Sequence, residues 1–72
     1  MPDFRAKIEL EDCTCERESA KACFIYIGDG PKAGQTVWIP KSQIDDDSEV
    51  YREGDTGSLV ISEWIAEEKG LI

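Results

Sequence analysis

Residues 4–11 alternate strictly between apolar and charged side chains, and no other feature of the sequence constrains the fold as strongly. The apolar positions are Phe4, Ala6, Ile8 and Leu10, and the charged positions are Arg5, Lys7, Glu9 and Glu11. Successive side chains of a β-strand point to opposite faces, so one face of this segment can be buried while the other stays in water. The pattern predicts a half-buried strand of an antiparallel sheet.

A second strand is predicted over residues 20–27, and it is apolar on both faces. One face carries Ala20, Ala22, Phe24 and Tyr26, and the other carries Cys23, Ile25 and Ile27. Such a strand is typical of the middle of a sheet whose second face is covered by another element. We expect the C-terminal helix to provide that cover. The polar segment 12–19 between the two strands is either a long hairpin connection or a continuation of the strands past the core.

Three more segments are predicted to be extended. Residues 28–34 contain three glycines and a proline, which is turn chemistry, and they lead into a strand over 35–40. Pro40 lacks an amide donor and must end that strand or place it at a sheet edge. A brief strand is predicted at 50–51 and a longer one at 58–61, where Leu59 and Ile61 share a face.

A short helix is predicted directly after the last strand. Ser62 can cap its N-terminus, Glu63 suits the positive end of the helix dipole, and Gly70 suits the C-terminal stop. About two turns of helix are not stable alone, so the helix must dock through its apolar side chains. We expect these to be Trp64, Ile65, Leu71 and Ile72.

These elements predict a mainly β (α+β) fold in a single domain over residues 1–72. The expected architecture is a small curved antiparallel sheet, or a partly open barrel, of about five strands with a short C-terminal helix.

The charge of the chain is strongly and unevenly acidic. Sixteen Asp and Glu against eight Lys and Arg give a net charge of −8, and residues 45–72 alone carry −7. Phosphate backbones repel such a surface, so direct nucleic-acid binding is disfavoured. The charge fits a basic protein partner, or serves solubility alone.

The residue types disfavour catalysis and metal binding. The chain has no histidine, which removes the commonest general base and most zinc sites. Cys13, Cys15 and Cys23 do not have zinc-site spacing and are interpreted as free thiols, with Cys23 as core filling. An odd cysteine count, no signal-like segment at residues 1–3 and no long apolar run predict a cytoplasmic location without membrane contact. We expect no enzyme activity and no cofactor.

Partner contact is expected at Trp38 and in the polar and acidic segments that follow it. If the helix covers Trp38, the residue is part of the architecture and the acidic loop is the better functional candidate; if Trp38 is open, it is the binding anchor. Calcium binding is less favoured than a solvated acidic loop, because the spacing is not that of an EF-hand. The candidate residues are Trp38, Lys41, Asp45, Asp46, Asp47, Glu49, Glu53 and Asp55.

The segments 37–44 (VWIPKSQI) and 59–71 (LVISEWIAEEKGL) resemble small uncharacterised domains encoded by bacteriophages and bacterial mobile elements. Those domains tend to have a proline where Ser62 stands. The resemblance covers roughly the C-terminal half. It implies an accessory protein in a bacterial host cell, and it implies no particular activity or functional residues.

The expected function is non-enzymatic protein–protein contact with a nucleic-acid-processing or defence enzyme. The chain would act as an acidic inhibitor of the anti-CRISPR or DNA-mimic type, with carboxylates standing in for phosphates. The alternative is a single-stranded nucleic-acid-binding module that uses Trp38, Tyr26 and Tyr51 with nearby lysines. A homodimer through an exposed edge strand is a further expectation.

Overall fold

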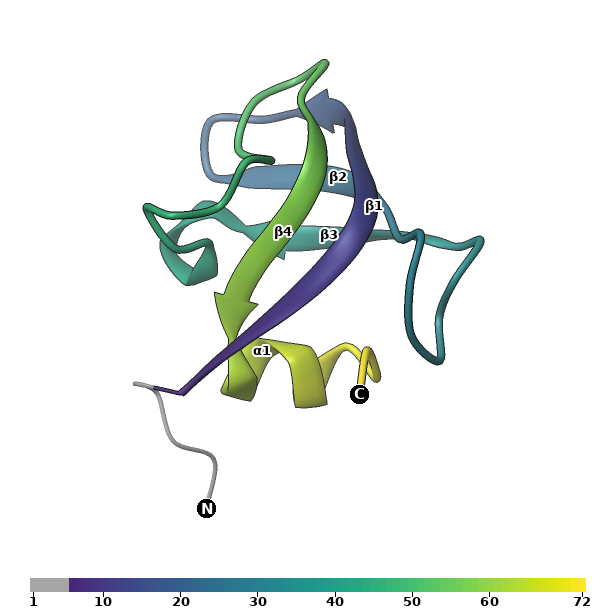
Figure 1. Cartoon of the computed structure of the whole chain (residues 1–72). Helices are drawn as coiled ribbons and strands as arrows, with labels where there is room; N and C mark the ends of the chain where they lie inside the picture. Colours follow the sequence, from purple (N-terminus) through teal and green to yellow (C-terminus); the bar gives the residue numbers. More distant parts are fainter. Residues whose placement is uncertain (1–5) are drawn as a thin grey trace.

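The computed structural model of the chain describes residues 6–72 (Figure 1). Its elements are β1 (Lys7–Glu18), β2 (Ala22–Tyr26), β3 (Thr36–Pro40), the 3₁₀ turn η1 (Lys41–Gln43), β4 (Thr56–Ser62) and α1 (Glu63–Glu68). The strands form one antiparallel sheet in the order β3-β2-β1-β4. The predicted class, a small curved antiparallel sheet with a short C-terminal helix, is confirmed.

β1 is long and bent, and it joins the two halves of the sheet. Its first part pairs with β4 and its last part pairs with β2. The register shifts between Leu10 and Cys13 and again between Cys15 and Arg17, and Asp12 has a positive φ of 56°. Bulges of this kind bend a strand and increase its twist. As a result, β1 and β4 cross β2 and β3 steeply in Figure 1, and most of the segment 12–19 continues the strand.

Gly28 lets the chain that leaves β2 pass directly against the first of these bulges. A Cβ atom at position 28 would overlap the backbone carbonyl of Asp12. The sequence predicts turn chemistry for residues 28–34, and Gly30 and Gly34 do adopt positive φ values of 83° and 92°. Gly28 instead serves a close approach of two backbone segments.

The strands predicted at residues 20–27, 35–40 and 58–61 correspond to β2, β3 and β4. The strand predicted at 50–51 is wrong: within residues 6–72 the sheet has four strands, and Val50 is a fully buried loop residue. Phe4 and Arg5, the start of the predicted first strand, lie outside the described residues. A bridge between Ile44 and Ile61 brings the segment after β3 alongside β4.

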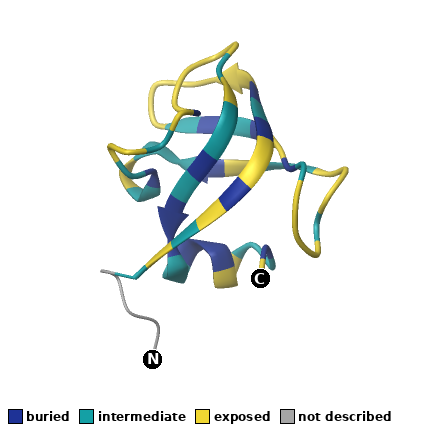
Figure 2. Cartoon of the chain, in the orientation of Figure 1, coloured by how far each residue is buried: buried dark blue, intermediate teal, exposed yellow. Residues whose placement is uncertain are grey.

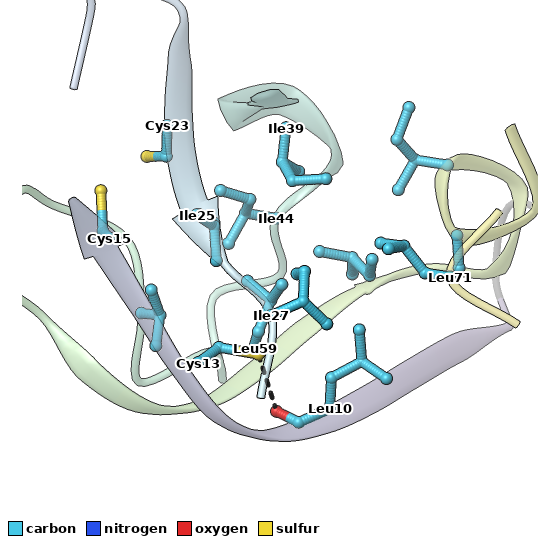
Figure 3. Close-up of a cluster of buried hydrophobic side chains, with 14 residues drawn as sticks. Leu10, Cys13, Cys15, Cys23, Ile25, Ile27, Ile39, Ile44, Leu59 and Leu71 are labelled. Atoms are coloured by element: carbon cyan, nitrogen blue, oxygen red, sulfur yellow. Dashed lines mark hydrogen bonds between the residues drawn. The ribbon is translucent and has the colours of Figure 1, made fainter. Parts of the chain in front are cut away.

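The core lies inside the curve of the sheet (Figures 2 and 3). Each strand contributes side chains from one face, and the loop residues Ile44 and Val50 fill the space between them. Ile8, Val37 and Trp64 are partly buried against this cluster. The buried members are Leu10, Cys13, Cys15, Cys23, Ile25, Ile27, Ile39, Ile44, Val50, Leu59, Ile61, Ile65, Ala66 and Leu71.

Both predicted ends of the helix are confirmed. The Ser62 hydroxyl accepts a hydrogen bond from the Ile65 amide at 3.3 Å and so caps the first turn. At the other end, Gly70 has a φ of 70°, and the amides of Gly70 and Leu71 donate to the carbonyls of Glu67 and Ala66. These two bonds form a Schellman motif. Leu71 is buried as expected, whereas Ile72 is 50% exposed.

The helix does not cover the second face of β2, and that prediction is wrong. Ser62 is both the last residue of β4 and the helix cap, so no loop separates the two elements. α1 can therefore reach only the nearby ends of β4 and β1, where it packs (Figure 1). β2 is two strands away in the sheet order, and its outer face keeps Tyr26 38% exposed.

Among residues 6–72, no helix has the length and apolar character needed to cross a membrane.

Candidate functional site

The outer face of β2 and β3 carries three aromatic rings, which we call the aromatic face: Phe24, Tyr26 and Trp38. Phe24 and Trp38 are opposite each other in the β2–β3 register, with ring centroids 5.0 Å apart and planes inclined at 37°. Trp38 is 44% exposed and Tyr26 is 38% exposed. Of the two alternatives weighed for Trp38, the open one applies. Exposed tryptophan and tyrosine on a rigid strand pair are typical anchors of an interaction surface.

The aromatic face lies in the least acidic part of the chain. Arg17 of β1 is opposite Phe24 in the register, so Arg17, Phe24 and Trp38 form one row across three strands. Within residues 6–72, neither Arg17 nor Lys21 makes an ion pair, and both are exposed. Residues 20–44 carry three lysines and one aspartate, a net charge of +2 in a chain of −8. The rings therefore lie beside positively charged side chains, although the chain as a whole is strongly negative.

Lys41, predicted as a partner contact, is engaged inside the molecule. Its ammonium forms an ion pair with Glu18 and lies 5.7 Å from the centre of the Tyr51 ring. The hydrogen bond that the Lys41 ammonium donates to the Glu18 carboxylate raises the pKa of Lys41 and lowers the pKa of Glu18. The side chain of Lys41 is only 17% exposed. It stabilises the end of the sheet and is not presented to a partner.

Tyr51 lies beside Lys41, is 37% exposed, and does not belong to the aromatic face. Its backbone carbonyl accepts a hydrogen bond at 2.9 Å from the thiol of Cys23, which points into the core from β2. The alternative in which Tyr51 shares a face with Tyr26 and Trp38 does not fit the structure, because Tyr51 lies next to the Cys23 side of β2 and Phe24 and Tyr26 leave the opposite side.

Three of the six predicted acidic residues bind backbone amides, two within their own loop and one in β4. Asp45 accepts from the Asp47 amide and pairs with Lys7, whose hydrogen bond lowers the pKa of Asp45. Glu49 accepts from the Ser58 amide at 2.9 Å. Asp55 accepts from the amides of Arg52 and Tyr51, and these bonds lower the pKa of Asp55. These carboxylates hold the segment 45–55 in shape.

The other three acidic residues point into solvent. Asp46, Asp47 and Glu53 are exposed, and no side-chain hydrogen bond or ion pair joins their carboxylates to the described residues. The acidic loop therefore presents about half of the carboxylates that its sequence suggests.

The cysteines are core residues with low nucleophilicity. All three are free and fully or almost fully buried, which confirms the expectation for Cys23 (Figure 3). Burial raises the pKa of each thiol, and it raises that of Cys15 to about 12. A thiol that stays protonated at neutral pH is neither a good nucleophile nor a ready metal ligand. In residues 6–72, no three His, Cys, Asp or Glu side chains gather in a geometry that could hold a metal ion.

A depression of about 200 Å³ lies between η1 and the start of α1, lined by Lys7, Ser42, Gln43, Ile44, Asp45 and Ser62. Its polar groups satisfy each other: Ser62 donates to the Gln43 side chain at 2.6 Å, and Lys7 pairs with Asp45.

Comparison of the chain with protein-family models, curated proteins and solved structures found no match.

Sequence reasoning did not select Arg17 or Phe24 as site residues. The signal that could have found Phe24 was the second apolar face of the strand at 20–27. The sequence pattern predicts that the C-terminal helix covers this face, so Phe24 was not considered exposed. Arg17 could not be placed, because its alignment with Phe24 depends on a bulge between Cys15 and Arg17.

Proposed function

We propose that this chain is a non-enzymatic binding module that docks on a protein partner through the aromatic face. The observation that carries the proposal is Trp38, which is 44% exposed although its ring contacts Phe24 in a tilted pair, on two strands with a closely packed inner side. Large aromatic side chains in such positions contribute most of the energy of many interfaces, because a partner removes their surface from water.

The partner class follows from the charge. With a net charge of −8 and exposed carboxylates at Asp46, Asp47 and Glu53, the chain attracts basic surfaces and repels acidic ones. Nucleic-acid-processing and defence enzymes have basic channels for phosphate backbones. We propose that the chain inhibits such an enzyme by occupying its surface. In this proposal Trp38 is the anchor and the exposed carboxylates attract the basic surface over a longer range, so this is a weaker form of DNA mimicry than six free acids would give.

The test is a quantitative capture experiment with matched variants. Wild type, Trp38→Ala and Ile72→Ser are immobilised, and bound bacterial proteins are measured by mass spectrometry at low and moderate salt. Ile72 is a suitable control because it is an equally exposed apolar residue outside the aromatic face. We expect a basic partner that wild type and Ile72→Ser retain, that Trp38→Ala loses and that higher salt weakens. Equal capture by Trp38→Ala would disprove the role of the aromatic face.

The inhibitory role needs a separate measurement. The chain is titrated into the captured enzyme, or into a purified CRISPR effector nuclease, and DNA cleavage is followed. A loss of cleavage that Trp38→Ala does not produce supports inhibition. Undiminished cleavage under saturating binding would leave a binding module without inhibitory activity.

Single-stranded nucleic-acid binding is a second candidate, and the row of Arg17, Phe24 and Trp38 favours it. Bases stack on such rings, and a nearby arginine can contact the backbone phosphates. Titration with oligothymidylate tests it through tryptophan fluorescence, with Trp38→Phe to separate the signal from that of Trp64. Quenching at low micromolar oligonucleotide that weakens with salt supports this candidate, and an unchanged spectrum contradicts it.

A further inference from the structure

The two edges of the sheet differ in whether their backbone groups are paired. The outer edge of β4 is covered by the chain itself: Asp45 and Glu49 donate their amides to the carbonyls of Val60 and Ser58 at 2.8 and 2.9 Å. The Val60 amide donates to the Ser48 hydroxyl, and the Ser58 amide donates to the Glu49 carboxylate. Segment 44–49 thus acts as a substitute strand, and no second molecule can pair with this edge.

The edge of β3 is open, as the register shows. Ile27 donates to Gln35 and Lys41 donates to Lys21, so the odd-numbered residues of β3 make the ladder bonds to β2. Bonded and non-bonded pairs alternate in an antiparallel ladder. The amide and carbonyl groups of Thr36 and Trp38 therefore point away from β2. Among residues 6–72, no group pairs with the amides of Thr36 or Trp38.

The open edge also lacks the charges that usually protect edge strands from pairing. Thr36–Pro40 contains no charged side chain, although a third of the residues in the whole chain are charged. Natural proteins commonly place lysine or another charge on an exposed edge to prevent pairing. The only such device here is Pro40, which ends the strand.

We infer that β3 pairs with β3 of a second copy in a two-fold antiparallel arrangement. The register that fits places Thr36 of one copy opposite Trp38 of the other. In it, the amides and carbonyls of both residues in both copies are all paired. Pro40 needs no donor there, because it lies beyond these two bonded pairs.

The geometry gives a closed dimer with a continuous eight-stranded sheet. Each copy has one open edge and one covered edge, so pairing stops at two copies. Thr36 and Trp38 lie on the same outer face, so the aromatic faces of the two copies join into one larger surface and stay accessible. The inference is independent of the proposed function, which requires only that this face be open.

The net charge of each copy determines how the stability of the dimer should depend on salt. Two copies of net charge −8 repel each other, so dimerisation should strengthen as salt rises. This is the opposite of the dependence expected for a basic partner. Because a few residues on each side form the contact, we expect a weak dimer, populated at roughly 100 µM and above.

Sedimentation equilibrium of the purified chain at low and high salt tests the inference. The expected result is a shift from 8.1 kDa toward twice that mass with concentration, and more so at high salt. In Thr36→Pro, the substitution removes an amide that points to the open edge and leaves the β2 ladder intact. We expect it to weaken the dimer at least about tenfold. Thr36→Ala, which keeps the amide, should dimerise like wild type.

Hydrogen exchange of the Trp38 amide gives a second readout, which uses the wild type and does not require that a variant fold. In the wild type its protection should rise with protein concentration, whereas the Ile25 amide, inside the sheet, should be protected at every concentration. A monomer at all concentrations and both salts would overturn the inference. A dimer whose affinity Thr36→Pro leaves unchanged would also overturn it. So would protection of the Trp38 amide only in the presence of a captured partner, because the edge would then pair with a strand of that partner.

Discussion

The two faces of β2 are about equally apolar in sequence but differ completely in their surroundings. On the inner face, Cys23 and Ile25 are 0% exposed, and so is Ile27 directly after the strand. On the outer face, Phe24 is partly covered by Trp38, and Tyr26 is 38% exposed. The difference teaches that hydrophobicity marks a face that can be buried, whereas chain connectivity decides whether the molecule buries it. What the fold leaves open is then available to a partner.

The largest expected effect is on the inner face. Ile25→Ala should lower the free energy of unfolding by about 2–5 kcal/mol, because it removes buried methyl groups and leaves a cavity. A domain of this size has little reserve stability, so partial unfolding at 37 °C is expected. Urea denaturation followed by circular dichroism measures the change. The neighbouring outer-face variant Tyr26→Ala is the control, and equal losses in both variants would contradict the distinction between the faces.

A smaller loss is expected where β2 exits against the bulge of β1. Gly28→Ala should cost about 1–3 kcal/mol, since its methyl group would overlap the Asp12 carbonyl and push the two segments apart. Gly34→Ala is the comparison variant: its φ of 92° is unfavourable for alanine, unlike that of Gly28, but no atom lies within 4 Å of the added methyl. The same denaturation experiment should rank Gly28→Ala as the more damaging variant. The reverse ranking would show that backbone strain outweighs the close approach.

The buried thiols predict a loss of stability at alkaline pH. Folding raises the pKa of Cys15 from its ordinary 9.0 to about 12, so the unfolded chain loses that proton first. The contribution of Cys15 is fully present below pH 9 and declines as pH rises toward 12. The free energy of unfolding should fall by up to about 1.4 kcal/mol per pH unit for this thiol. Denaturation at pH 8, 9 and 10 should show a shallower decline in Cys15→Ala; parallel declines would contradict the assignment.

The smallest effect on stability is expected on the outer face. Trp38→Ala removes an exposed ring and one tilted aromatic pair, so the free energy of unfolding should change by about 1 kcal/mol or less. The affinity for a partner should fall much further, by about 2 kcal/mol or more if Trp38 is the anchor. Denaturation and binding are measured on the same preparation. If Trp38→Ala lost stability but kept its affinity for the partner, the outer face would contribute to folding and not to binding, contrary to the proposal.

Local patterns in the sequence were sufficient for most of the elements and for both ends of the helix, but not for the end of β1 at Glu18. Alternation identified the strands, and the helix boundaries followed from Ser62 and Gly70, because capping depends on residues a few positions apart. The same reasoning assigned a brief strand at residues 50–51 that the structure does not contain. There Val50 fills the core from a loop, and a buried apolar residue looks the same in sequence in either state.

The candidate site was predicted only in part. Trp38 could be named because an apolar residue faced away from Val37 and Ile39 on a strand that ends at Pro40. Lys41 and three of the six acidic residues looked equally available in sequence, but the structure engages them with Glu18, Lys7 and backbone amides. The two ion pairs join residues far apart in the chain, and the bonds to backbone amides depend on the shape of the loop, neither of which composition encodes.

The sequence by itself determined a small, acidic, mainly β domain with a capped terminal helix, since periodicity and capping act within a few residues. Only the tertiary structure decided that this helix stays at the end of β4, that Trp38 and Tyr26 remain open, and that one sheet edge is covered while the other is free. The physical reason is that these outcomes depend on the bulges of β1 and on the absence of a loop at Ser62, and both act through the relative placement of whole elements.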